Sequence, residues 1–258
     1  MPAGRQVNIL GVEVDDISQK DAVDATLKMA KDKRGGKYVV TVNGEFVMLA
    51  RRDPNFAEIL NRADLAVPDG AWSVWAKLIL GGKEHDRVTG VDLVEKLCEK
   101  SAKKAITVGF LGGFGNVAEM VAKRQLGKNE GLKVVFAGPG DPAIGYDLRL
   151  KKEFLRLSRI DILFVAYGMG QQEFWIKRHI NRLNVGVFIG VGGAFDYLSM
   201  VKKRAPKWLQ GIGFEWLWRL VMEPSRARRM LRVFPLFWIL VFWQWVMKTS
   251  FFKKETIL

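Results

Sequence analysis

The chain has 258 residues, of which 49% are hydrophobic and 26% are charged, a composition typical of a folded globular protein and not of a disordered one. The net charge is +14. A single cysteine, Cys98, excludes an internal disulfide and a cysteine-rich zinc site, and the two histidines, His85 and His179, are too few for a histidine-based metal centre. The N-terminus lacks an apolar secretory core, so we expect a cytoplasmic protein.

The positive charge is concentrated near the C-terminus. Residues 202–258 hold 12 Lys and Arg against 3 Asp and Glu, whereas residues 1–201 hold 29 against 24. Six of the nine tryptophans lie at or after Trp208. This combination predicts an anionic partner for the segment, which is nucleic acid, anionic lipid or a phosphorylated substrate. We therefore divide the chain into an α/β catalytic core, residues 1–201, and a C-terminal appendage, residues 202–258.

Short apolar runs alternate with helical patterns along the core. The expected strands are residues 7–14, 38–42, 65–67, 106–111, 134–137, 162–166 and 185–191. The expected helices are residues 19–31, 46–51, 72–80, 90–99, 117–126, 148–157 and 174–183. Strands that are apolar throughout indicate a mostly parallel, Rossmann-like sheet with helices on both faces. In such a sheet the ligand binds beyond the carboxyl ends of the strands.

A glycine-rich turn, residues 109–115, follows an expected strand and opens a helix, where backbone amides are able to bind phosphate. Ala118 stands where the dinucleotide fingerprint has its last glycine, and no acidic residue follows at the usual distance. The turn therefore favours close strand–helix packing over dinucleotide binding, with phosphate contact as the open alternative.

Two loops at strand ends carry candidate site residues. Asp69, in Pro68-Asp69-Gly70, either caps its own turn or serves as a catalytic carboxylate facing the crevice. In residues 167–173, the glycines permit close backbone approach, and Gln171 and Gln172 offer amides suited to a sugar. The alternative for the second loop is a plain helix N-terminus with Glu173 in its first turn.

Arginines are densest at Arg219, Arg226, Arg228, Arg229 and Arg232. Arg226 and Arg229 would share one face of a helix that begins near Pro224. Arginine side chains bind diphosphate well, and the alternative is a solvated or lipid-facing stripe.

Residues 233–247 contain no charge and are rich in Phe and Trp. As a helix they would measure ~22 Å, against a hydrocarbon core of ~30 Å, too short to span it comfortably. The flanking Arg232 and Lys248 predict a segment that lies in one leaflet of an anionic membrane. The alternative is a helix buried in the protein or packed in a homo-oligomer.

Taken together, the motifs resemble the WecG/TagA/CpsF family of bacterial glycosyltransferases over nearly the whole chain. The residues that carry the resemblance are Thr41-Val-Asn43-Gly-Glu45, Asp64-Leu-Ala-Val-Pro-Asp69-Gly70, Arg87-Val-Thr-Gly90, residues 168–173, Gly190-Val-Gly-Gly-Ala-Phe-Asp196, Arg204-Ala-Pro206 and Glu215-Trp-Leu-Trp-Arg219-Leu with Glu223-Pro-Ser-Arg226. The family has Pro-Lys where this chain has Gly170 and Gln171, so the donor sugar stays open.

The resemblance implies inverting, metal-independent and cofactor-free transfer of an N-acetylmannosamine-type sugar. The donor would be a UDP-sugar and the acceptor an undecaprenyl-diphosphate-linked amino sugar, at the inner face of the cell membrane. Asp69 falls on the family's proposed base. The substrate-binding residues that the resemblance implies are Thr41, Asn43, Gln172, Arg219, Arg226 and Arg229.

The chemistry is consistent with the residues. Inverting transfer needs a base for the acceptor hydroxyl and positive charge for the departing diphosphate. No Asp-x-Asp sequence occurs in the chain, so arginines would replace magnesium. A nucleic-acid-binding module is disfavoured, because the charge adjoins an apolar stretch, and a dinucleotide-dependent oxidoreductase is disfavoured by the broken glycine fingerprint.

Overall fold

Six parallel strands form the central sheet, in the order β4-β3-β8-β7-β5-β6. The computed structural model describes residues 5–211, 213–222 and 224–255, and only the backbone path of residues 224–229, 232 and 251–255. The strands are β3 (Lys37–Val42), β4 (Leu65–Pro68), β5 (Thr107–Gly112), β6 (Lys133–Gly138), β7 (Ile160–Ala166) and β8 (Val185–Gly190). The expected parallel α/β fold is confirmed. Because β3 and β8 are neighbours though distant in sequence, their carboxyl ends form the switch point at which such sheets bind ligands.

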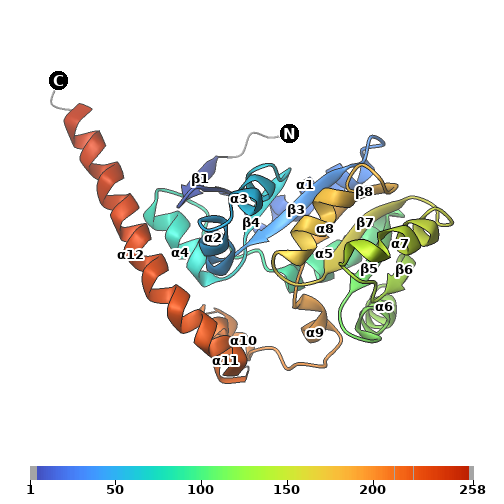
Figure 1. Cartoon of the computed structure of the whole chain (residues 1–258). Coiled ribbons are helices and arrows are strands. Elements are labelled where there is room, and N and C mark those ends of the chain that lie inside the picture. The colour runs from blue at the N-terminus through green and yellow to red at the C-terminus, as the bar shows by residue number, and fades with distance from the viewer. Residues whose placement is uncertain (1–4, 212, 223, 256–258) are drawn as a thin grey trace.

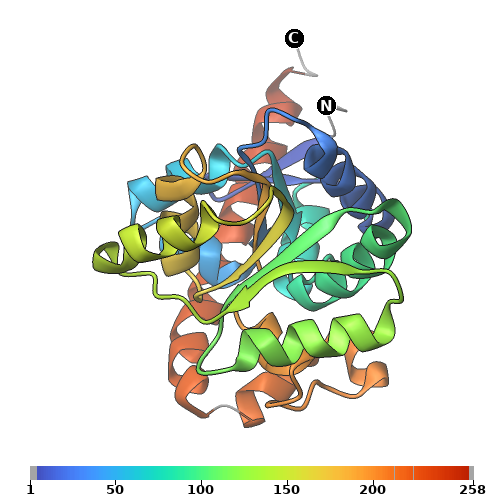
Figure 2. The same cartoon turned by 90° about the vertical axis from the view of Figure 1, so that its right-hand side faces the viewer.

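One face of the sheet is covered by α1 (Gln19–Lys31), α5 (Gly90–Lys104), α6 (Val117–Lys128) and α9 (Ala194–Leu198), as Figures 1 and 2 show. Ser18 caps α1 as expected, accepting a hydrogen bond from the Asp21 amide. Side chains alternate between the two faces, so Val39 packs on this face whereas Val40 packs on the other. Cys98 is a buried core residue of α5.

The other face is covered by two groups of helices. Over β5, β7 and β8 lie α7 (Asp147–Phe154), preceded by the 3₁₀ turn η1 (Ile144–Tyr146), and α8 (Gln171–His179). Over β3 and β4 lie α2 (Gly44–Ala50), α3 (Pro54–Asn61) and α4 (Ala71–Ile79). The helix α3 was not expected from the sequence, although Asp53 caps it and Pro54 opens it.

Residues 7–14 do not form the single strand that we expected. They form an antiparallel hairpin of β1 (Gln6–Ile9) and β2 (Val12–Asp15), apart from the main sheet. Leu10 and Gly11 both have positive φ angles, 52° and 95°, which a two-residue hairpin turn requires. The hairpin is tied to β4 by Asp15, which accepts a hydrogen bond from the Ala66 amide at 2.7 Å.

Three helices follow α9: α10 (Lys207–Gly211), α11 (Glu215–Met222) and α12 (Pro224–Glu255). The helix α12 begins at Pro224 as expected and runs along one edge of the molecule, beside α2 and α4 (Figure 1). With 32 residues it is ~48 Å long. By length and composition alone, its stretch Val233–Ser250 is long and apolar enough to cross a membrane.

The two sides of α12 have different surroundings. Phe237 and Val241 are buried against the second face of the core. Further along the same side, Gln244 accepts a hydrogen bond from the Leu10 amide, and Lys248 donates one to the Leu80 carbonyl. The rest of the described helix surface carries exposed apolar residues, which are Leu231, Leu236, Ile239, Phe242, Trp243, Trp245 and Met247. Residues 233–247 therefore form a core-packing helix that also presents an apolar face.

Candidate active site

Two adjoining pockets meet at Asp69. The polar pocket, about 560 Å³, lies beyond the carboxyl ends of β3, β7 and β8 and includes Thr41, Gln172 and Gly192 in its lining. The tryptophan pocket, about 90 Å³, lies between the core and the helices after α9, with Trp72 and Trp216 in its walls. Residues that line both pockets are Asn43, Glu45, Asp69, Thr89 and Arg219.

Asp69 follows directly on β4, and its amide donates to the Val42 carbonyl at 2.8 Å. Its side chain does not cap α4, so the alternative of a simple turn-capping role is not what the structure has. The carboxyl group touches the pocket but is otherwise surrounded by protein, and this burial raises its pKa to about 6. The positive charge of Arg219 opposes the rise. A carboxylate with that pKa is suited to accept a proton near neutral pH.

Asn43 joins the two pockets at the start of α2. Its Oδ1 accepts hydrogen bonds from the amides of Glu45 and Phe46, at 3.0 and 3.1 Å. Since the carbonyl oxygen caps the helix, the NH₂ group is the part of Asn43 suited to a ligand.

Thr41 and Gln172 line the polar pocket, and both are engaged with the protein. The Thr41 hydroxyl donates to the Gly190 carbonyl at 2.9 Å. The Gln172 Oε1 accepts from the Gly192 amide at 2.9 Å, and its Nε2 donates to Glu173 Oε1 at 2.6 Å. The two side chains thus fix the loop after β8 to β3 and α8, and so shape the pocket floor.

Glu173 is a residue whose burial the sequence did not indicate. It stands in the first turn of α8 as expected, yet it is 1% exposed and its Oε2 accepts from the Gly170 amide at 2.7 Å. Burial raises its pKa to about 7. The spacing from Gly170 is that of a capping box, a signal that was present in the sequence.

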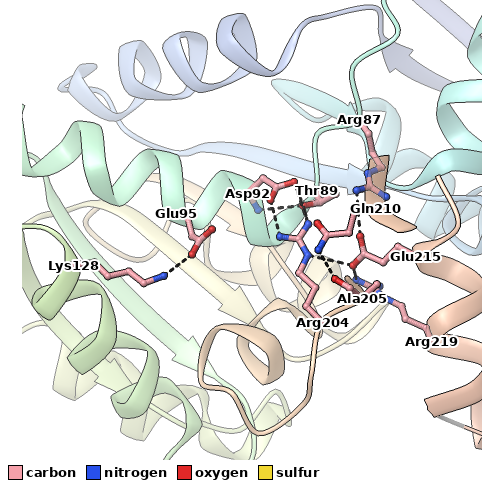
Figure 3. A network of polar contacts seen from close by, with 10 residues as sticks. All are labelled: Arg87, Thr89, Asp92, Glu95, Lys128, Arg204, Ala205, Gln210, Glu215 and Arg219. Atoms are coloured by element: carbon pink, nitrogen blue, oxygen red, sulfur yellow. Dashed lines mark hydrogen bonds and ion pairs between the residues drawn. The ribbon is translucent and has the colours of Figure 1, made fainter. Parts of the chain in front are cut away.

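A network of ion pairs joins α11 to the core (Figure 3). Among its members, Arg219, Glu215 and Arg87 lie close enough to Asp69 to act on its pKa. Glu215 is buried, and its Oε1 lies 3.0 Å from Arg219 Nη2 and 3.4 Å from Arg204 Nε. Its Oε2 lies 3.3 Å from Arg87 Nη2. Arg204 also pairs with Asp92 on α5, with 2.8 Å between Nη1 and Oδ1. Three arginines therefore share one buried carboxylate at the rim of the site.

The structure places Arg219 at the site, where it lines both pockets and lies 4.9 Å from the centre of the Tyr197 ring. Arg87, part of a recognised motif but not expected as a site residue, lines the tryptophan pocket. Arg226 and Arg229 belong to the first turns of α12, and their side chains lie outside the described residues.

Within the part of the chain that the structure describes, the glycine-rich turn at residues 109–115 is not in the lining of either pocket. A Cβ atom on Gly112 would lie 2.7 Å from the Ala166 backbone, and one on Gly113 would lie 2.8 Å from Val117. The turn therefore serves close packing of β5 on its neighbours. Within the described part of the chain, no group of three or more His, Cys, Asp or Glu side chains is placed to hold a metal ion.

Comparison with known proteins decides the family. The family described as "Glycosyl transferase WecG/TagA/CpsF family" matches residues 7–250, nearly the whole chain. The chain belongs to this glycosyltransferase family. The resemblance found in the sequence motifs is thereby confirmed.

Three curated relatives of this glycosyltransferase share the name N-acetylglucosaminyldiphosphoundecaprenol N-acetyl-beta-D-mannosaminyltransferase. The relative from Bacillus spizizenii is 32% identical over 227 residues, which is 84% of this chain and 86% of that protein. Those from Bacillus subtilis and Staphylococcus aureus strain MW2 are 28% and 29% identical, and each alignment covers 90% of this chain and about 90% of the relative.

Proposed function

We propose that this glycosyltransferase moves an N-acetylmannosamine-type sugar from a UDP-sugar to N-acetylglucosamine linked to undecaprenyl diphosphate. The names of its relatives describe the same sugar transfer onto the same lipid-linked acceptor. The single observation that carries the mechanism is the position of Asp69, at the junction of two pockets with Arg219 beside it. Two substrates that react with each other have to meet at one base.

Asp69 is the proposed general base. Its carboxylate takes the proton from the acceptor hydroxyl while that oxygen attacks the anomeric carbon of the donor. The bond to the diphosphate breaks on the opposite side, and UDP leaves with the electron pair, so the configuration inverts. A pKa of about 6 keeps Asp69 ionised at neutral pH and still basic enough to accept the proton.

Arginines supply the charge that stabilises the departing UDP, with no metal ion required. Arg219 and Arg87 lie around Asp69 and lower its pKa, so both are close enough to act on charge at the reaction centre. A guanidinium group donates several hydrogen bonds in a fork that matches phosphate oxygens. Arg226 and Arg229 are further candidates for the same diphosphate.

We further propose that the enzyme is a peripheral protein of the inner membrane face. The exposed apolar side of α12, with Ile239, Phe242 and Trp243 at its centre, suits burial in the headgroup region. The opposite side of the helix packs on the core, which supports a helix lying along the surface over one that crosses. A homo-oligomer that covers this face is the alternative.

The decisive experiment incubates purified enzyme with a panel of UDP-sugars and a short-chain lipid diphosphate that carries N-acetylglucosamine. We expect transfer from UDP-N-acetylmannosamine, undiminished by EDTA, and a product with inverted anomeric configuration by NMR. Transfer from another UDP-sugar would change the proposed identity of the donor sugar. Strict dependence on a divalent cation would contradict the role given to the arginines, and sugar transfer without a lipid-linked acceptor would contradict the proposed acceptor.

A further inference from the structure

Glu173 is a buried carboxyl group beneath the polar pocket that takes no part in the chemistry described above. Both Glu173 and its neighbour Gln172 are 1% exposed. A buried carboxyl group costs free energy unless hydrogen-bond donors compensate for the lost water. Here the donors are Gln172 Nε2, at 2.6 Å, and the Gly170 amide, at 2.7 Å.

Hydrogen-bond polarity fixes the Gln172 amide at both ends. The Gly192 amide is only able to donate, so it requires Oε1 on its side, at 2.9 Å. In its ionised form the Glu173 carboxylate is only able to accept, so it requires Nε2 on its side. Rotating the amide by 180° would place donor against donor at Gly192 and acceptor against acceptor at Glu173. The carboxylate therefore selects one of two amide orientations.

That orientation bears directly on the pocket. Gln172 lines the polar pocket, and its Nε2 carries two hydrogens, of which Glu173 accepts one. The second is available to an acceptor atom of a ligand. The amide packs closely on Gly190, because a Cβ atom there would lie only 2.8 Å from Nε2.

We propose that Glu173 is a positioning residue, which holds the Gln172 amide so that Nε2 donates to a hydroxyl or phosphate oxygen of the sugar nucleotide. The proposal rests on the function proposed above. The proposal takes the polar pocket, about 560 Å³ against about 90 Å³ for the tryptophan pocket, as the one that holds the sugar nucleotide, with Arg87 at the boundary toward Asp69. Gln172 lines only the polar pocket, so its loss should affect binding of the sugar nucleotide and not of the acceptor.

Glu173→Gln tests the role. The backbone amides of Gly192 and Gly170 both donate, and two neighbouring glutamine side chains offer only two acceptor oxygens for the three contacts between them. One of the three contacts is therefore always donor against donor. We expect a lower melting temperature and a donor KM raised about tenfold, with the acceptor KM within about twofold of wild type. In the reciprocal variant, Gln172→Glu with Glu173→Gln, all three contacts again pair an N–H group with an oxygen. The variant nevertheless lacks the NH₂ group that position 172 presents to the pocket. We expect its melting temperature to recover and its donor KM to stay high.

A swap that restored the donor KM together with the melting temperature would overturn the proposal, because it would reduce Glu173 to a structural role. An unchanged donor KM in Glu173→Gln would overturn it as well. The matched control is Glu119→Gln, an exposed glutamate in the first turn of α6, which should change neither quantity. Calorimetric binding of UDP and of the UDP-sugar needs no turnover. It therefore distinguishes failure of the positioning role from failure of the proposed transfer.

Discussion

Glu215 on α11 pairs with Arg87 on the loop before α5, with 3.3 Å between Oε2 and Nη2, and this contact ties the C-terminal helices to the core beside Asp69. Both side chains are largely buried, at 6% and 18% exposure. Removing one member of a buried ion pair leaves the partner's charge without compensation. The pair therefore holds the tryptophan pocket together as well as the fold.

Glu215→Gln should lower the free energy of unfolding by about 3 kcal/mol, the order found when a buried pair loses one partner. Urea denaturation followed by circular dichroism measures the change. The matched control is Glu95→Gln, which breaks an exposed pair with Lys128 and should cost no more than about 0.5 kcal/mol. Equal effects in the two variants would contradict the role given to Glu215.

Asp69→Asn should reduce kcat by about 10²–10⁴, the usual contribution of a general base. In the wild type, kcat/KM should rise with pH and level off above about 6, where the Asp69 carboxyl is ionised. The residual kcat/KM of Asp69→Asn should not show this rise with pH.

The stability of Asp69→Asn follows from the same pKa. A carboxyl whose pKa is raised on folding stabilises the protein fully below its unfolded pKa, and that contribution is lost as pH rises through about 6. At pH 7.5 the variant should therefore melt no lower than wild type. A large loss of stability would mean that Asp69 has a structural role.

Arg219→Gln should move the acid limb of the pH profile to higher pH. The Arg219 charge lowers the pKa of Asp69, so its removal leaves burial less opposed and the pKa rises further. The residual activity of the variant, measured from pH 5 to 8, gives the new midpoint. A shift to lower pH would show that Arg219 does not act on Asp69 electrostatically.

The exposed face of α12 should bind anionic membranes. Phe242→Ser with Trp243→Ser removes two side chains that are 59% and 60% exposed, so the fold should be retained while flotation with phosphatidylglycerol vesicles falls severalfold. Phe114→Ser removes an exposed aromatic residue elsewhere and serves as the control.

Truncation after Arg232 is the poorer test, because it also removes Phe237 and Val241 from the core. Undiminished flotation of the double variant would favour an oligomer interface.

The sequence alone was sufficient for the parallel sheet and for the edge of it at which the candidate site residues lie. The periodicity of apolar residues, which distinguishes strands from helices, is a local property of the sequence. In a parallel sheet the carboxyl ends of all strands lie at one edge, so Asp69, Thr41 and Gln172 could be expected to lie near each other. The hairpin at residues 6–15 was missed because its turn has Gly11 without the Asn or Asp that usually marks such a turn.

Only the tertiary structure decided which polar groups face each other. The Gln172 amide is oriented by Gly192, twenty positions away, and Glu215 reaches Arg87 from a distant part of the chain. The apolar stretch of α12 was visible in the sequence, but which side packs on the core depends on Phe237 and Val241 meeting Trp72 and its neighbours. Hydrophobic content is encoded residue by residue. Burial and the pairing of polar groups depend on surfaces that the chain brings together only when it folds.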